Sequence, residues 1–435
     1  METITQTIPI IEKIFGEIAD SIGWETKFIQ REKKITGSTF AKALVFGFQS
    51  NPEMTYEELS QSAAMIGLPM TAQGMEQRFN EKAAEFMRKL LEFAVGLAII
   101  PQQIESITLT KNFTGVYLRD STVILLPREL LEIWQGVGAS QGANSAIKLQ
   151  VNLDYKNGQL YGPILQNGRE QDQNSPYQSV QLPEGSLQLG DLGYFSLKRF
   201  SNDQKSGVYW ISRLKTGIRI YTSEDQPIDL IPWLQAETTS KIDMPILMGV
   251  TQKIACRIIA HRVPQEVVDQ RIYKMKIEAE KQRQPLSSAR IALAGWTILV
   301  TNIPLEVLST QEVCTLARIR WQIEMLFKLW KSYMKIDEWR SNNKWRILCE
   351  VYAKLLALLI SHWFLITSIW KFPDRSLFKA MKTIQKFAAT IAISLNNPES
   401  LEKILICLQH TLEKGCRLNR RKSRPNSYQI ISGLC

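Results

Sequence analysis

The spacing of hydrophobic residues divides the chain into helical ends and a strand-rich middle. Up to about residue 108, and again beyond about residue 309, apolar side chains recur with the period of a helix. Between these segments lie short runs rich in β-branched residues, which are typical of strands. The clearest runs are 106–110, 115–127, 207–214 and 295–304, and residues 147–166 predict two strands joined across Asn157-Gly158. This order of elements predicts an α/β fold with helical segments at both ends.

The segment that begins at Thr55 has the outline of a helix-turn-helix. Thr55 is a suitable N-cap, and Glu58 stands at capping-box spacing from it. Gly67 and Pro69 end the first helix, and Thr71 can cap the next. Because two capped helices joined by a glycine turn occur in many helical domains, DNA binding and ordinary packing both stay open for this segment.

Composition and charge narrow the class of protein. The 435 residues are too many for one ordinary core and predict about two to four domains. A hydrophobic content of 45% and a charged content of 22% are those of a globular chain. The net charge of +11 predicts an anionic partner, with nucleic acid first and a membrane surface second.

Several common kinds of site and segment are disfavoured. The six cysteines are scattered without a CxxC pair, so we expect reduced thiols in a cytosolic protein and neither a disulfide framework nor a zinc site. The three histidines lie far apart, which disfavours a histidine-centred metal site or triad. The N-terminus has acidic residues and no basic start, unlike a signal peptide. Residues 355–370 are apolar but shorter than the roughly 20 residues of a membrane helix, so we expect a buried helix there.

One glutamate stands among cations on the helix predicted over 318–332. At about 100° per residue, Glu324 shares a face of this helix with three cations, Arg320, Lys328 and Lys331. A separate apolar stripe suits packing on a sheet and consists of Ile319, Ile323, Leu326 and Trp330. The charges either form a surface ladder of ion pairs, worth about a few tenths of a kcal/mol each, or surround a catalytic carboxylate. The second interpretation requires further carboxylates, because one glutamate cannot hold hard cations alone.

Two aspartates on predicted strands qualify as partners of Glu324. Asp120 ends the apolar run GVYL, and Asp191 follows LQLG. Each charge would thus leave the sheet interior at a strand end that is open to solvent and metal. Each alone could equally be a turn or N-cap residue. Asp154 has a similar setting but leads into the Asn-Gly turn, and we assign it to the hairpin.

The combined pattern resembles the IS4 family of DDE transposases. The catalytic helix of that family carries the signature Tyr-x2-Arg-x3-Glu-x6-Lys. Arg320, Glu324 and Lys331 match it with the spacing intact, while Ala317 stands where the family has its tyrosine. That tyrosine helps to contact phosphate at the transposon end.

The likeness extends to the strands and covers roughly residues 30–370. RDST at 119–122 and GDLGYFS at 190–196 are similar to the family's surroundings of its first and second aspartates. VYWISR at 208–213 resembles the strand that follows the second.

The resemblance implies an RNase H-like core with a two-metal site. Asp120, Asp191 and Glu324 would be both the catalytic residues and the metal ligands. They would hold two Mg²⁺ ions about 4 Å apart, with Mn²⁺ as a substitute, around a scissile phosphate. One ion would activate water or a 3′-hydroxyl, and the other would stabilise the leaving oxygen. In related enzymes the freed 3′-hydroxyl first attacks the opposite strand and forms a hairpin.

Five residues are candidates for DNA or phosphate contact. Arg320 would bind phosphate bidentately and Lys331 as a point charge, with Lys328 as a weaker third candidate. Trp296 either stacks on a flipped-out base, like the family's tryptophan, or is a core residue of its strand. Arg213 either contacts the DNA backbone or is an exposed cation at a strand end.

The resemblance also predicts how the chain is divided. We expect a helical DNA-binding domain at 1–108, the first part of the RNase H-like core at 109–214, a β-rich insertion domain at 215–294, the second part of the core with the catalytic helix at 295–372, and a C-terminal helical region at 373–435 with basic residues at 417–424.

The implied function is metal-dependent DNA cleavage and strand transfer at the ends of an insertion sequence, in bacterial cytoplasm at the nucleoid. The implied partners are double-stranded DNA, as terminal inverted repeats and as target, and a second copy of the chain in the synaptic complex, without a membrane. Two alternatives stay open. One is a catalytically silent DNA-binding derivative, for which Ala317 is the support, and the other is an RNase H-like nuclease that cuts without joining strands.

Overall fold

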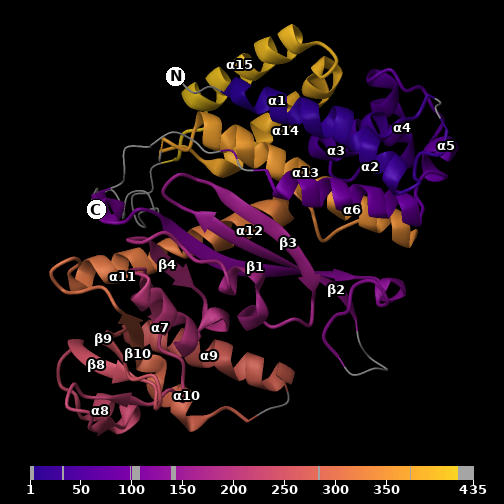
Figure 1. Cartoon of the computed structure of the whole chain (residues 1–435). Helices are drawn as coiled ribbons and strands as arrows, with labels where there is room; N and C mark the ends of the chain where they lie inside the picture. Colours follow the sequence, from indigo (N-terminus) through magenta and orange to yellow (C-terminus); the bar gives the residue numbers. More distant parts are fainter. Residues whose placement is uncertain are drawn as a thin grey trace. The chain divides into compact units, whose positions relative to one another are not determined.

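The computed structural model of the protein describes residues 4–31, 34–97, 99, 108–138, 144–282, 285–372 and 374–419. The chain folds into two compact units (Figure 1). Unit 1 consists of Met1–Glu105, Asp120–Glu170 and Gln322–Cys435, and unit 2 of Ser106–Arg119 and Gln171–Trp321. The expected α/β fold with helical segments at both ends is confirmed.

Unit 1 is built mainly of helices. They are α1 (Ile8–Lys13), α2 (Ala19–Glu25), α3 (Gly37–Ser50), α4 (Tyr56–Met65), α5 (Ala72–Glu76), α6 (Glu81–Val95), α12 (Trp321–Met334), α13 (Lys344–Ser368), α14 (Leu377–Ser394) and α15 (Pro398–Lys414). α13 is the central one, because it packs against both α3 and α6 (Figure 1). Every residue of α13 from Arg346 to Ser368 is buried. The core of unit 1 therefore forms around this helix.

The apolar run at 355–370, predicted as a buried helix, lies largely in α13. In the described part of the chain it is the one helix long and apolar enough to cross a membrane, and its most apolar window is wholly buried inside the protein. The expected buried helix is confirmed. Burial on all sides explains why the part of the helix after Lys354 is predominantly apolar on every face.

The helix-turn-helix outline is confirmed as structure. The Thr55 hydroxyl accepts a hydrogen bond from the backbone N–H of Glu58, and the Glu58 carboxylate accepts one in return from the backbone N–H of Thr55. The Thr71 hydroxyl caps α5 by accepting from Gly74. Gly67 has a φ of +86°, a conformation that favours glycine, after the end of α4.

The hairpin of unit 1 is also confirmed. β2 (Ser145–Asp154) and β3 (Leu160–Asn167) pair in antiparallel fashion. Gly158 in the turn has a φ of +83°, and a Cβ there would lie only 2.6 Å from the Trp370 ring. His362, buried in α13, has its Nε2 2.6 Å from the Gly158 carbonyl, and burial lowers the pKa of its imidazole to about 4. Asp154 belongs to the turn, since its carboxylate accepts from the backbone N–H of Lys156.

Unit 2 is built on strands. They are β4 (Leu187–Gly190), β5 (Tyr209–Arg213), β6 (Ile220–Tyr221), β7 (Pro227–Ile228), β8 (Lys241–Met248), β9 (Ile254–Arg262), β10 (Trp296–Thr301) and the first residues of β1 (Val116–Leu126). Their order is β1-β4-β5-β10-β9-β8-β6-β7. β1, β4 and β5 are parallel, and each later neighbour is antiparallel. The helices of this unit are α7 (Leu197–Lys205), α8 (Leu230–Ala236), α9 (Gln265–Gln282), α10 (Ser288–Ala292) and α11 (Thr310–Ile319).

Three local predictions are wrong. Of the strand predicted at 106–110, the described residues Thr108–Thr110 form a 3₁₀ turn, since β-branched residues favour a strand only where neighbours pair with it. Asp120 does not end a strand, because β1 continues to Leu126. The helix predicted over 318–332 is two helices, α11 and α12, which meet at Arg320. The basic residues predicted at 417–424 lie partly outside the described residues.

Candidate active site

Asp120 lies in the middle of β1, at the point where the strand loses a neighbour. The parallel ladder between β1 and β4 ends with the pair Arg119 and Gly190. Residues 116–119 are buried, whereas 120–123 are half-buried. The Asp120 carboxylate accepts a hydrogen bond of 2.8 Å from the backbone N–H of Ser121. Asp120 thus leaves the buried part of the sheet because the β1–β4 ladder ends, although the strand β1 itself continues.

Asp191 occupies the matching position directly after the end of β4. It follows Gly190 directly, just as Asp120 follows Arg119, so both aspartates are the next residues after the last pair of the ladder. Asp191 is exposed, and its carbonyl accepts a hydrogen bond of 2.9 Å from Tyr194 in the turn that follows. The strand-end setting predicted for Asp191 is confirmed.

The burial of Arg119 indicates which side of the sheet its neighbour Asp120 faces. Its side chain is fully buried, and none of its three guanidinium nitrogens has a hydrogen-bond partner in the described part of the chain. Burial, and to a smaller extent the nearby Arg199, lower the pKa of this guanidinium to about 10. Arg199 itself pairs with Asp203 at 2.7 Å. Because successive strand residues face opposite sides, Asp120 points away from this buried cluster.

Glu324 lies in the first turn of α12, a helix that contacts β1 within unit 1. The Lys331 ammonium of α12 donates a 3.3 Å hydrogen bond to the carbonyl of Val123 on β1. Glu324 precedes Lys331 by seven residues, which places both within about 20° of each other around the helix. The half-buried Glu324 therefore shares the face of α12 that meets β1. The expected apolar stripe is confirmed, since Ile319, Ile323, Leu326 and Trp330 are all buried.

The remaining signature residues lie around the junction of α11 and α12. Arg320 caps the end of α11 with helical backbone angles, φ −50° and ψ −31°, and is half-buried. Ala317 is half-buried on α11, and Lys328 is exposed on α12. The spacing of the signature is thus carried across a helix junction, not along one straight helix.

Trp296 and Arg213 belong to unit 2. Trp296 begins β10, is only 7% exposed and packs with Leu234 and other apolar residues. The guanidinium of Arg262 lies 4.6 Å from the centre of its ring. Its core packing is therefore observed, and stacking on a base stays a prediction. Arg213 is exposed at the end of β5.

The candidate residues are divided between the two units. Unit 1 holds Asp120, Glu324, Lys328 and Lys331, and unit 2 holds Asp191, Arg320, Trp296 and Arg213. Within the described ranges, no three His, Cys, Asp or Glu side chains form a group that could hold a metal ion.

Sequence reasoning missed two residues that act on α12. Asp337 lies 3.6 Å from the Lys331 ammonium, because the chain turns back after α12 through Lys335, whose φ is +45°. Lys354 of α13 is fully buried, and its ammonium donates hydrogen bonds to the carbonyls of Lys335 (3.0 Å) and Glu338 (2.9 Å). A cation at a helix C-terminus is favourable, so Lys354 fixes the end of α12. No local sequence signal marks either contact.

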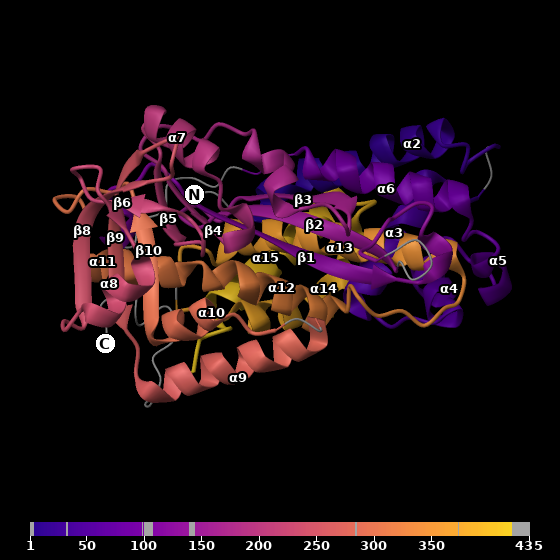
Figure 2. The same cartoon turned by 90° about the horizontal axis from the view of Figure 1, so that it is seen from below.

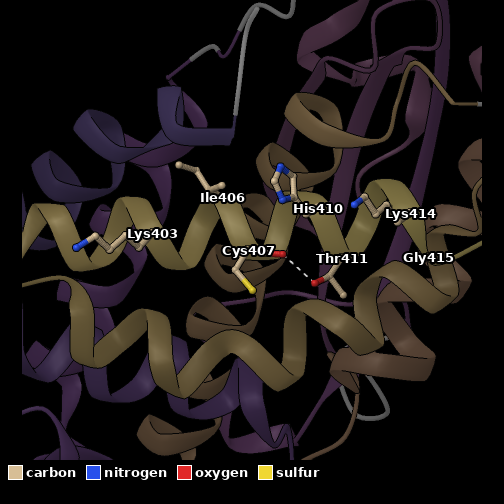
Figure 3. Close-up of a pocket in the computed structure, with 7 residues that line it drawn as sticks. All are labelled: Lys403, Ile406, Cys407, His410, Thr411, Lys414 and Gly415. Carbon is tan, nitrogen blue, oxygen red and sulfur yellow. Dashed lines mark hydrogen bonds between the residues drawn. The ribbon is translucent and has the colours of Figure 1, made fainter.

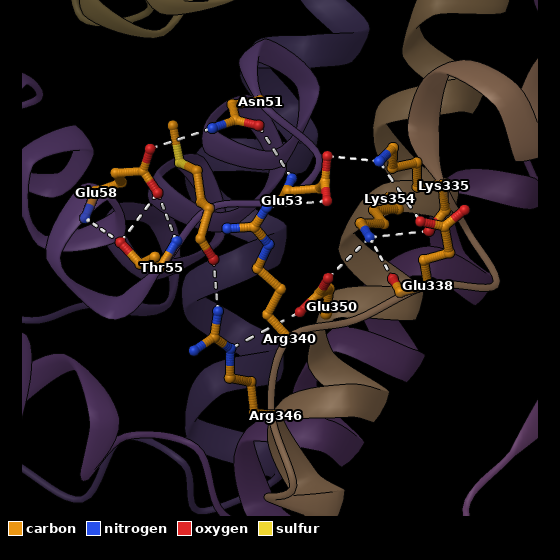
Figure 4. Close-up of polar contacts among 11 residues, drawn as sticks. Asn51, Glu53, Thr55, Glu58, Lys335, Glu338, Arg340, Arg346, Glu350 and Lys354 are labelled. Atoms are coloured by element: carbon orange, nitrogen blue, oxygen red, sulfur yellow. Dashed lines mark hydrogen bonds and ion pairs between the residues drawn. The ribbon is translucent and has the colours of Figure 1, made fainter.

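Lys354 is part of a buried charge network on α13 (Figure 4). Its ammonium lies 2.8 Å from the carboxylate of Glu350, and the Arg346 guanidinium lies 3.7 Å from the same carboxylate. Arg346 also donates a 2.6 Å hydrogen bond to the carbonyl of Met54, in the loop between α3 and α4. Outside this network, Glu53 of that loop pairs with Lys335 at 2.5 Å. The end of α12 is thereby tied to the N-terminal helices of unit 1.

Comparison with known proteins identifies the family of this chain. Residues 111–360, more than half of the chain, match the family model described as "Transposase DDE domain". The transposase for insertion sequence element IS231F of Bacillus thuringiensis subsp. israelensis is 27% identical, with 97% of this chain and 94% of the relative covered. The transposase for insertion sequence element IS1151 of Clostridium perfringens is also 27% identical, over 80% of this chain and 78% of the relative.

A solved structure shows a similar fold. The piggyBac transposase, in a synaptic complex with hairpin DNA, matches with a TM-score of 0.50 at 11% identity, over 98% of this chain and 88% of the other. The likeness confirms the RNase H-like transposase fold. Together with the family model and the relatives, it shows that the chain belongs to the DDE transposases of the IS4 type, the enzymes of DNA transposition.

Proposed function

We propose that Asp120, Asp191 and Glu324 are the catalytic carboxylates with which this transposase cuts and joins DNA at the ends of an insertion sequence. The observation that carries the proposal is the register of β1 and β4, whose last pair directly precedes both aspartates. The face of α12 that bears Glu324 contacts β1 through Lys331, which supports the third assignment.

These three side chains suit a divalent metal. Carboxylate oxygens are the ligands that Mg²⁺ prefers, and Mn²⁺ accepts the same donors. Asp191 is exposed and the other two are half-buried, so none of the three is sealed in a core. Two bound Mg²⁺ ions would polarise the scissile phosphate and favour an oxygen nucleophile.

The chemistry is an exchange of phosphate esters. In cleavage, a water oxygen forms a bond to phosphorus and the P–O3′ bond breaks, which leaves a 3′-hydroxyl. In joining, that 3′ oxygen forms the new bond to a target phosphate, and one target oxygen leaves. Arg320 would orient phosphate oxygens with its fork of donors, and Lys331 and Lys328 would bind them as point charges. Lys331 would exchange Val123 and Asp337 for phosphate.

The partners and the setting are part of the proposal. Duplex DNA, as inverted repeats and as target, fits the net charge of +11. The segment 1–108, with its capped α4 and α5, would bind DNA, ahead of a core at 109–214 and 295–372 that is interrupted by 215–294. We further propose a homodimer in the synaptic complex and a bacterial cytoplasmic location at the nucleoid, without a membrane. Trp296 and Arg213 remain candidates for DNA contact.

The direct test is cleavage of a duplex that carries the inverted repeat flanking the gene. We expect cutting with Mg²⁺ or Mn²⁺ and none after metal removal with EDTA, because ionised carboxylates alone repel the phosphate. Strand transfer would appear as joining of the freed end to a second duplex. Cutting that persists in EDTA would overturn the metal assignment, and cutting without joining would favour the nuclease alternative.

Lys331→Ala is expected to weaken binding of this duplex and to flatten its salt dependence. Loss of one phosphate contact lowers the slope of log affinity against log salt by about 0.9. Binding measured by fluorescence anisotropy at several salt concentrations gives the slope. Lys331→Arg, which keeps the charge, serves as the control. An unchanged slope for the alanine variant would exclude a phosphate contact at Lys331.

A further inference from the structure

The exposed face of α14 carries a row of lysines. Lys379, Lys382 and Lys386 are all exposed, and their spacing of three and four residues keeps them on one side of the helix. The opposite side is buried, with Ala380 and Ile384 in the core. α14 contains no aspartate or glutamate. We refer to these three residues as the α14 lysine stripe.

No acidic side chain among the described residues pairs with the stripe. In the described part of the chain, none of the three lysines forms an ion pair with an acidic side chain. The Lys379 ammonium instead donates to the carbonyl of Arg417 (2.7 Å) and to the side chain of Asn419 (3.0 Å). The Lys382 ammonium lies 5.9 Å from the centre of the Tyr333 ring. The stripe thus leaves uncompensated positive charge on the surface.

The stripe lies beside the helix that carries Glu324. The side-chain amide of Gln385 donates a 3.2 Å hydrogen bond to the carbonyl of Tyr333, and the Tyr333 and Phe378 rings are 5.6 Å apart. Tyr333 belongs to the last turn of α12, so α12 and α14 are neighbours within unit 1 (Figure 2). Tyr333 follows Glu324 by nine residues, about 180° around the helix, so α14 packs on the side of α12 that faces away from Glu324.

The adjoining helix extends the same kind of surface. A shallow hollow over α15 is lined by Lys403, Ile406, Cys407, His410, Thr411, Lys414 and Gly415 (Figure 3). These residues include two lysines and a histidine but no carboxylate. The exposed Arg417 follows and is held beside Lys379. Cations therefore recur on α14 and along this hollow, whereas the exposed carboxylates of α15, Glu399 and Glu402, precede it.

We propose that the α14 lysine stripe binds the phosphate backbone of duplex DNA next to the catalytic helix. The stripe is about 10.5 Å long, and a DNA strand carries one phosphate per roughly 3.4 Å of axis, so the stripe spans about three phosphate intervals of one strand. A second copy of the chain is the poorer partner, because a symmetric contact would set lysines against lysines. The inference rests on the proposed function and extends it with a DNA track outside the signature residues.

The test uses the full-length protein with Lys382→Ala and Lys386→Ala combined. Lys379 is left in place because it holds the segment after α15. The matched control is Lys198→Ala with Lys205→Ala, two exposed lysines of α7 in unit 2. Fluorescence anisotropy is recorded against salt on two probes, a duplex with the flanking inverted repeat and a duplex of random sequence.

We expect the α14 variant to bind both duplexes more weakly, with the salt slope lowered by about 1.8, while the control keeps the wild-type slope. An unchanged slope would overturn the proposal, and so would a loss confined to the inverted repeat. Analytical sedimentation without DNA tests whether the stripe instead contacts a second copy of the chain. A change of oligomeric state in the α14 variant at unchanged DNA affinity would also overturn the proposal. Loss of cleavage in Glu324→Gln is measured independently, so failure of the stripe and failure of the catalytic assignment are distinguishable.

Discussion

Glu324→Gln is expected to reduce DNA cleavage by about a hundred- to a thousandfold, the scale of single groups that stabilise charge in a transition state. Glutamine preserves the shape and packing of Glu324 in the first turn of α12 but removes the anionic oxygen that a divalent metal needs. Binding of the same duplex should be retained, because removing a negative charge does not oppose phosphate. The measurement is the rate of Mg²⁺-dependent cutting of the inverted-repeat duplex.

Glu402→Gln is the matched control, since it makes the same change on the exposed surface of α15. It should cut like the wild type. Equal cutting by Glu324→Gln and the wild type would contradict the catalytic assignment. A wild type that binds DNA but cuts with neither Mg²⁺ nor Mn²⁺ would instead support the silent derivative. In that case, Ala317→Tyr would show whether the missing tyrosine of the signature is the cause.

Local chemistry made much of the fold predictable. The capping box of Thr55 and Glu58 and the turn at Gly158 each depend on residues close together in sequence. The signature from Arg320 to Lys331 is of the same kind, because its spacing can be read without knowing what surrounds it. Such features are predictable since their hydrogen bonds or motif positions lie within a few residues of each other.

The errors arise where the tertiary structure decides. Asp120 looked like a strand end, but β1 continues to Leu126, and only the ladder with β4 stops there. Which neighbour a strand has at each residue is a non-local property. The break at Arg320 has no glycine or proline to mark it, and its backbone stays helical. The contact of Asp337 with Lys331 depends on the chain turning back at Lys335.

The charges of α13 show the same limit most clearly. Arg346, Glu350 and Lys354 follow one another at intervals of four, which is also the pattern of a solvated ion-pair ladder. In the structure all three are buried, with Lys354 fully so. Burial lowers the pKa of Lys354 and raises the pKa of Glu350, and each partner's charge opposes the shift of the other. Sequence periodicity cannot distinguish the two settings, although their energies differ greatly.

Lys354→Met is therefore expected to destabilise unit 1 by about 3–5 kcal/mol, the cost of leaving a buried charge without its partner. Methionine fills a similar volume, but among the described residues it leaves the Glu350 carboxylate with Arg346 alone, at 3.7 Å. It also leaves the carbonyls of Lys335 and Glu338 without this donor. The matched control is Lys371→Met, which removes a 3.8 Å pair between the exposed Lys371 and the half-buried Glu413 and should cost no more than about 1 kcal/mol.

Amide hydrogen exchange along α13 is the suitable measurement, because a chain of two units need not unfold in one step. Adding Glu350→Gln to Lys354→Met should restore part of the lost protection, since no uncompensated carboxylate then remains in the core. Equal protection in Lys354→Met and Lys371→Met would mean that the buried network contributes no more than a surface pair. If the network instead fixes the end of α12, Lys354→Met should also loosen amides near Met334, which Lys371→Met leaves unchanged.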